Sequence, residues 1–111
     1  MREARLKSKL FVQALLHRCT MAATAAYVVT VGDADAGAIF VKVIKADRTA
    51  LVLSPVHSDG GEGRWREQSY GDEAAADAFL ARQRGYDGDL WVIEIESRDG
   101  QHPLLDSLIK D

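Results

Sequence analysis

Two aspartates separated by one residue, Asp33 and Asp35, lie in a glycine-flanked segment of the sequence. Carboxylates in a tight loop can bind a hard cation. A calcium loop of the EF-hand type beginning at Asp33 would need glycine and glutamate where this chain has Ala38 and Ile44. Aspartates also accept hydrogen bonds from backbone N–H groups in turns, which explains the pair without an ion. Asp33 and Asp35 are therefore weak metal candidates, and we expect no metal and no cofactor.

The sequence contains three histidines and one cysteine, His17, His57, His102 and Cys19. No pair has the spacing of a structural zinc site. His17 and Cys19 are two residues apart on an expected helix, so their side chains point in different directions. Cys19 shares the apolar side of that helix with Leu15, which is typical of an inert core thiol. No catalytic residue is identified from these side chains.

Glu94 and Glu96 are the third candidate group, and paired carboxylates of this kind can act in acid–base chemistry. Alternate residues of a strand point to the same face, so these two carboxylates lie together, opposite the large apolar side chains of the same segment. If Lys42 of another strand lies on that face, a mixed charged and apolar surface results. Cross-strand ion pairs on a sheet are commoner than an active site of this kind.

The length and composition indicate one globular domain over residues 1–111. The chain has 111 residues, of which 47% are hydrophobic and 28% charged, with a net charge of −3. These values exclude collagen-like, low-complexity and disordered chains. The lone cysteine excludes an internal disulfide. The negative net charge argues against a protein that coats nucleic acid through its overall charge.

The N-terminal segment resembles a signal peptide only superficially. A basic start precedes the apolar run Leu10–Leu16, but Gln13 interrupts that run, and His17 and Arg18 follow it. No segment approaches the ~18 apolar residues that a transmembrane helix needs. We therefore expect a cytoplasmic protein that does not enter a membrane.

Hydrophobic periodicity and turn residues predict eight elements. The first helix contains Leu10 to Cys19 with Ser8 as its N-cap, and Asp72 and Gly85 bound the second helix. The predicted strands, second helix and terminal helix lie at Tyr27–Val31, Ala38–Ile44, Thr49–Pro55, Arg64–Tyr70, Glu73–Gln83, Asp89–Ser97 and after Pro103. This order predicts an α+β fold, with a mainly antiparallel sheet of four to five strands and helices packed mostly on one face.

Three blocks, Arg5–Ser8, Gly32–Val43 and Asp89–Glu96, resemble an uncharacterised alphaproteobacterial family, the domain of unknown function DUF1491. The blocks occur in the family's order and span nearly the whole chain. Phe11 stands where many relatives have tryptophan. The resemblance implies a bacterial, cytoplasmic, single-domain protein and carries no assigned reaction.

Three functional classes remain open. The leading hypothesis is a small non-catalytic interaction or assembly module that acts through its sheet or its first helix. The residues of this possible surface are Arg5, Lys7, Lys9, Gln13, His17, Lys42, Glu94 and Glu96. An alternative is a nucleic-acid or other polyanion binder that uses the basic N-terminal segment, with Arg64, Trp65 and Arg66 as a stacking strand. A small enzyme of unidentified reaction comes third.

The first helix is more apolar than a surface helix should be, because its apolar side chains surround most of its axis. One sheet covers only part of that circumference. Either the terminal helix near Leu104 and Leu108 covers the remainder, or a second copy of the chain does. We expect a homodimer, since two-fold symmetry is the commonest way to close such a surface.

Overall fold

The structure is a computed structural model that describes residues 7–56 and 64–109. Its elements are α1 (Ser8–Met21), β1 (Ala25–Thr30), β2 (Ile39–Ile44), β3 (Ala50–Val56), β4 (Arg64–Tyr70), α2 (Glu73–Tyr86), β5 (Trp91–Glu96) and the 3₁₀ turn η1 (Leu105–Ser107). The predicted α+β class and the order of the elements are confirmed. None of the helices within the described ranges is long and apolar enough to span a membrane.

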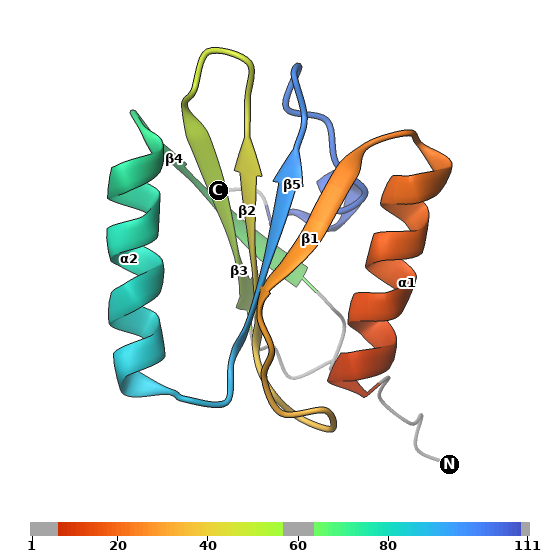
Figure 1. The fold of residues 1–111 in the computed structure, drawn as a ribbon, viewed down its shortest axis with the longest axis vertical. Coiled ribbons are helices and arrows are strands. Elements are labelled where there is room, and N and C mark those ends of the chain that lie inside the picture. Colours follow the sequence, from red (N-terminus) through yellow and green to blue (C-terminus); the bar gives the residue numbers. More distant parts are fainter. Residues whose placement is uncertain (1–6, 57–63, 110–111) are drawn as a thin grey trace.

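The five strands form one sheet in the order β1-β5-β2-β3-β4 (Figure 1). Strand β5 lies between β1 and β2 and runs parallel to β2. The other neighbours, β1 with β5, β2 with β3 and β3 with β4, are antiparallel, as predicted for most of the sheet. Helix α2 makes the long connection that a parallel pair requires, because it carries the chain from β4 back to the middle of the sheet.

The helices cover opposite faces of the sheet (Figure 1), rather than lying mostly on one face. Helix α1 packs its buried side chains against one face together with the segment around Leu104. Helix α2 packs Ala76 and Leu80 against the other face. The reason is that every residue of β2 is buried, so the central strands are apolar on both faces and require a cover on each.

The N-terminus of α1 is capped by a loop and not by Ser8, which corrects the prediction. Ser8 is the first helical residue, and its hydroxyl donates a hydrogen bond to the carbonyl oxygen of Gly37 at 2.7 Å. The backbone N–H groups of Ser8 and Lys9 donate to carbonyl oxygens of the loop between β1 and β2. These bonds satisfy donors that a helix N-terminus leaves free, and they join α1 to the sheet.

Helix α2 begins at the predicted residue and ends later than predicted. The Asp72 carboxylate accepts a hydrogen bond from the N–H of Ala75 at 2.8 Å, which is the expected N-cap. Gly85 lies inside the helix rather than after it, because the backbone N–H of Asp87 still donates to the carbonyl of Gln83 at 3.0 Å. The helix therefore extends to Tyr86, beyond the predicted end at Gln83.

The chain after Pro103 covers the apolar side of α1 that the sheet leaves free. Only a single 3₁₀ turn forms there, shorter than the predicted helix. Leu104 is buried in the α1 core, and Leu108 packs against it. The Arg18 guanidinium also donates to the carbonyl of Pro103 at 3.0 Å. Of the two expected covers for α1, the structure shows the terminal segment.

Leu104 should carry most of the stability that the terminal segment provides. We expect Leu104→Ala to lower the free energy of unfolding by about 3 kcal/mol, because it opens a cavity in the core below α1. The matched control is Leu105→Ala, which removes a side chain that is 38% exposed and should cost less than about 1 kcal/mol. Urea denaturation measures both, and equal losses would contradict this role of the segment.

Candidate functional site

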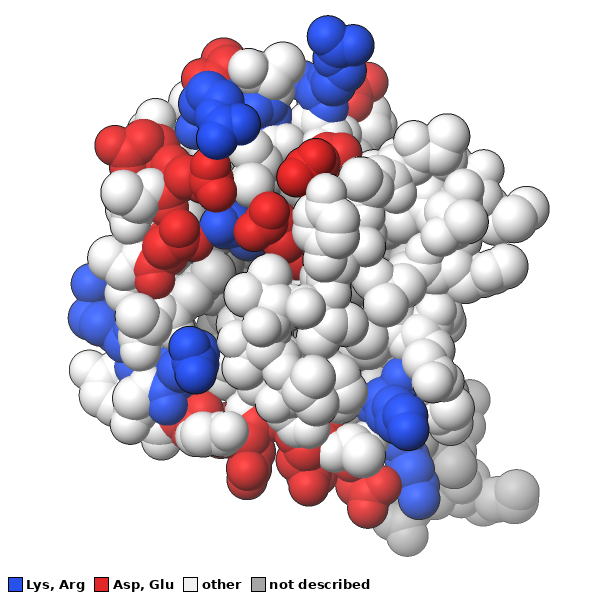
Figure 2. Space-filling view, in the orientation of Figure 1, with Lys and Arg blue, Asp and Glu red and all other residues white. Residues whose placement is uncertain are grey.

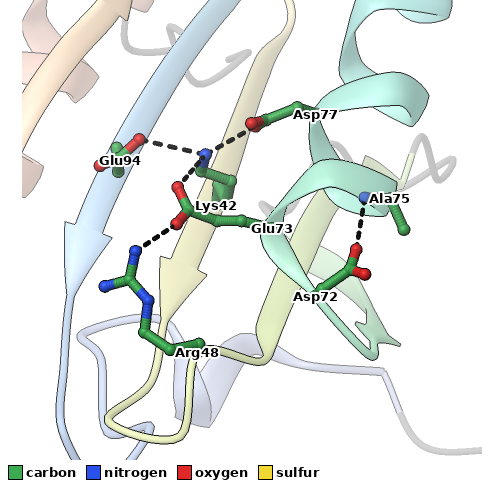
Figure 3. Close-up of polar contacts among 7 residues, drawn as sticks. All are labelled: Lys42, Arg48, Asp72, Glu73, Ala75, Asp77 and Glu94. Atoms are coloured by element: carbon green, nitrogen blue, oxygen red, sulfur yellow. Dashed lines mark hydrogen bonds and ion pairs between the residues drawn. The ribbon is translucent and has the colours of Figure 1, made fainter.

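A buried ammonium group is the main polar feature between the sheet and α2. Lys42 lies on β2, and its side chain is only 5% exposed. Its Nζ lies 2.6 Å from Oδ1 of Asp77, 3.2 Å from Oε1 of Glu94 and 3.3 Å from Oε2 of Glu73 (Figure 3). We call these four residues the Lys42 cluster.

Sheet register and helix periodicity bring the Lys42 cluster together. Lys42 and Glu94 are direct partners in the parallel pairing of β2 with β5. This is the shared face that strand alternation suggests. Glu73 and Asp77 are one helical turn apart on α2 and lie above Lys42. These two acids were not predicted as site residues from the sequence, although their four-residue spacing on the expected helix was a usable signal.

The Lys42 cluster holds its lysine in the charged form. Burial alone would lower the pKa of Lys42, but hydrogen bonds to Asp77, Glu94 and Glu73 and the charge of Glu94 outweigh it, so the pKa is raised. An ammonium group has three N–H donors, and each has a carboxylate partner here. Arg48 adds a second cation through a 2.9 Å contact with Glu73. Lys42 therefore ties α2 to the sheet and is not a free nucleophile.

A cavity of about 340 Å³ opens beside the Lys42 cluster. Lys42 and Glu94 line it from the sheet, and Val29 and Thr30 of β1 line it as well. Arg84 and other residues of α2 complete the lining. The cavity is thus partly charged and partly apolar, and it reaches β1, one of the two edge strands of the sheet.

Strand β1 presents an uncharged edge beside this cavity. Its side chains carry no charge, and three large apolar residues at or next to it are well exposed: Tyr27 (47%), Val29 (57%) and Val31 (72%). Figure 2 shows charged side chains over α2 and an uncharged area over β1 and most of α1. A hydrogen bond from the Tyr27 hydroxyl to Glu96 raises the pKa of Tyr27.

The structure divides the predicted interaction residues between two surfaces. Lys9, Gln13 and His17 are exposed on α1, and exposed Lys7 lies 3.6 Å from Asp35. Arg5 lies outside the described residues. The second set, Lys42, Glu94 and Glu96, belongs to the opposite face, where Lys42 is buried and Glu96 is exposed. These residues therefore do not form one continuous site.

The Asp33 carboxylate is used in a turn. Its Oδ2 accepts hydrogen bonds from the N–H groups of Asp35 at 3.1 Å and Ala36 at 2.8 Å. Trp91 Nε1 donates to the Asp33 carbonyl at 2.8 Å, so the loop is also fixed to β5. A Cβ at Gly37 would collide with the carbonyl oxygen of Asp89, which explains the glycine there. Over residues 7–56 and 64–109, no three His, Cys, Asp or Glu side chains are grouped to hold a metal.

The remaining candidate side chains lie in the interior. Cys19 is fully buried, and burial raises the pKa of its thiol, as expected for an inert core cysteine. Trp65 is also buried, and its ring lies 5.8 Å from that of Phe11 between centroids. It therefore offers no exposed face for stacking on a base. His57 lies outside the described residues.

His102 is a buried histidine with one unpaired nitrogen. Its Nδ1 accepts a hydrogen bond from the N–H of Leu104 at 3.2 Å. Among the described residues, its Nε2 has no hydrogen-bond partner, and the nearest carboxylate oxygen, of Glu67, is 3.7 Å away. Burial lowers the pKa of His102, although the Glu67 charge opposes this shift. The neutral imidazole therefore supports the segment that covers α1.

Comparison with known proteins gives one family and no established activity. Residues 6–105 match the model of a family described as a protein of unknown function, DUF1491. This agrees with the resemblance that the three sequence blocks indicate. No curated protein matches the chain.

Solved structures with the same fold include two of DUF1491 family proteins from Caulobacter crescentus CB15. The crystal structure is 34% identical, with a TM-score of 0.83 over 95% of this chain and 98% of that one. The NMR structure is 34% identical, with a TM-score of 0.83 over 97% and 100%. A protein from A. tumefaciens, solved in solution, is 35% identical, with a TM-score of 0.76 over 85% and 87%.

Removal of the Lys42 ammonium should destabilise the fold through the acids left behind. We expect Lys42→Met to lower the free energy of unfolding by about 3 kcal/mol, because Glu94 would remain largely buried without a cation. The double variant Lys42→Met with Glu94→Leu should recover much of this loss. Asp77→Asn is the control and should cost less than about 1 kcal/mol, since Asp77 is 56% exposed. Chemical denaturation measures all three, and a neutral Lys42→Met would contradict the role of the cluster.

His102 should make stability depend on pH below its ordinary pKa of 6.5. Folding lowers this pKa, so the unfolded chain binds the proton more readily than the folded chain. The stabilising contribution of neutral His102 is therefore fully present above pH 6.5 and is lost as the pH decreases from 6.5 through the folded pKa. His102→Asn keeps an acceptor for the Leu104 N–H and should flatten this fall. The exposed His17→Asn should leave it unchanged. Thermal melts from about pH 7 to 5 test this, and an unaltered profile in His102→Asn would contradict it.

Proposed function

Because the chain belongs to the DUF1491 family, which has no assigned activity, we propose a role from its geometry: a small non-catalytic interaction or assembly module that binds protein at β1. The proposed location is the bacterial cytoplasm, which is supported by the folding of Leu10–Leu16 into α1. No cofactor is part of this proposal.

The observation that carries the proposal is the edge of the sheet at β1, with which no other described segment pairs. An edge strand presents backbone N–H and C=O groups that can pair with another strand. Tyr27 and Val29 expose apolar surface on this strand, which has no charged residue, and Val31 exposes more just after it. Backbone pairing together with neighbouring apolar side chains is the arrangement by which sheet edges recognise proteins.

The polar groups of the α2 face support binding rather than catalysis. In the Lys42 cluster each carboxylate faces a cation, and the cation itself is saturated. A general base or a nucleophile would need a group that is free to exchange a proton with a substrate. The same contacts hold α2 in place and leave β1 outside its cover, since α2 contacts chiefly β2, β3 and β4.

The alternative of a polyanion-binding protein has less support from the described residues. Its stacking residue Trp65 is buried against Phe11, and Lys7 lies beside Asp35. The basic residues Lys9 and Arg18 on α1 are exposed but are accompanied by no exposed aromatic platform on that helix. We therefore prefer the interaction module.

Site-specific photocrosslinking in living bacterial cells tests the proposed function. A benzophenone amino acid is placed at Tyr27 on β1 or, as the matched control, at Tyr86 on α2, which is 82% exposed. Both changes replace one exposed aromatic side chain with another. We expect a discrete cross-linked protein adduct from position 27 and none from position 86. No adduct at 27, or the same adducts at both positions, would contradict the proposal.

A further inference from the structure

We propose that the protein bound at β1 is a second copy of this chain, paired antiparallel through β1 about a two-fold axis. The two sheets would then form one continuous sheet. This inference rests on the proposed function and names the partner of the same edge. It also locates the homodimer contact on β1, whereas the apolar pattern of the sequence predicts that contact on the first helix.

The two edges of the sheet are built differently. At the β4 edge, Leu108 forms a bridge with Trp65, and the N–H of Ile109 donates to the Trp65 carbonyl at 2.9 Å. The exposed charges of Arg64, Arg66 and Glu67 further block that edge. At the β1 edge, no other described segment pairs with the strand, and its sequence Ala25–Thr30 contains neither charge nor proline. An edge without these protections is suited to pair with another strand.

Strand geometry fixes how two β1 strands would meet. When two β1 strands pair antiparallel about a two-fold axis, directly opposed side chains lie on the same face of the sheet. Odd-numbered residues therefore oppose odd-numbered residues of the second copy, and even-numbered residues oppose even-numbered ones. The pairing of β1 with β5 is irregular between Val28 and Thr30, which confines regular pairing to the first part of the strand. The axis then lies at Ala26. Tyr27 would oppose Ala25 of the second copy, a large side chain beside a small one.

Electrostatics permits this pairing despite the acids on β5. Glu94 is the neighbour of Tyr27 within one sheet. In this register Glu94 of one copy and Glu96 of the other lie in the same row, separated by three strand spacings of about 4.8 Å, or about 14 Å. This exceeds the Debye length of about 8 Å at physiological ionic strength. The uncharged β1 strands would meet while the acidic groups stay apart.

A second copy also has an energetic advantage over a flexible foreign peptide. A disordered peptide loses about 1–2 kcal/mol of conformational freedom for each residue that it orders on binding. Strand β1 is already held in the extended form by its pairing with β5. The symmetric contact also removes the exposed surface of Tyr27 from two chains at once.

Helix α1 extends the uncharged surface next to the axis. The uncharged area in Figure 2 runs from β1 onto α1 without an interruption by charge. Met21, at the end of α1 that leads into β1, is 74% exposed. Because the paired β1 strands are antiparallel, two-fold pairing at Ala26 would place the Met21 end of each chain toward the exposed Val29 end of the other β1, which would bury more apolar surface than backbone pairing alone.

The oligomeric state of the purified full chain tests the proposal. Light scattering over a wide concentration range should show a dimer for the unmodified chain. Tyr27→Lys should weaken the dimer at least tenfold, because it removes from both chains the aromatic ring that the contact would bury beside the axis. Tyr86→Lys, which removes a more exposed tyrosine far along α2, should leave the dimer intact. Circular dichroism should show the same folded state for both variants.

A second measurement keeps the test independent of how Tyr27→Lys folds. Ala25→Cys and Tyr27→Cys variants are mixed and oxidised, while the native Cys19 is buried and unreactive. The proposed register predicts a disulfide between the two variants in preference to either homodimer. A monomer at all concentrations, a dimer resistant to Tyr27→Lys, or no such disulfide would overturn the proposal.

The two proposals can fail separately. If the purified chain is monomeric while position 27 cross-links to a different protein in cells, the interaction module stands and the second copy is excluded. If position 27 gives no adduct to any protein, including this chain, the proposed function itself fails.

Discussion

The buried ammonium group of Lys42 is the constraint from which the arrangement of this fold follows. A lysine at the centre of a sheet is costly unless acceptors surround it, and β5 supplies one while α2 supplies two. The Lys42 cluster therefore determines where α2 lies. It holds the helix above β2, β3 and β4 and leaves β1 on that face without a helical cover. The exposure of Tyr27 on that face is thus a consequence of where α2 is held.

The opposite face is closed mainly by apolar contacts. Helix α1 contributes Val12, Leu15 and Cys19, and the terminal segment adds Leu104. Because Leu104 and Leu108 close the core there and Leu108 also bridges to β4, the same segment blocks one sheet edge. Residues 104–109 therefore protect one edge, while no described segment pairs with the other. This asymmetry between the two edges is the basis of the proposed role in binding.

Much of the fold was predictable because it depends on local patterns. Asp72 indicated the start of α2, and the alternation around Glu94 gave the faces of β5 correctly. The position of β5 between β1 and β2 was not predictable, since it depends on pairing between distant segments. The opposite placement of the helices was missed because Phe40, Val52 and Val92 were not recognised as a second core. Lys42 and Glu94 were expected on one face, but the contribution of Glu73 and Asp77 required the three-dimensional position of α2.

Amide hydrogen exchange of β1 at low and high protein concentration tests the central claim most directly. Backbone N–H groups of an exposed edge exchange rapidly, whereas those in a strand pair are protected. If β1 is the pairing edge, the outward N–H groups within Ala25–Val28 should become more protected as the concentration rises, while β4 stays unchanged. Rapid exchange of these β1 groups at every concentration would contradict the account.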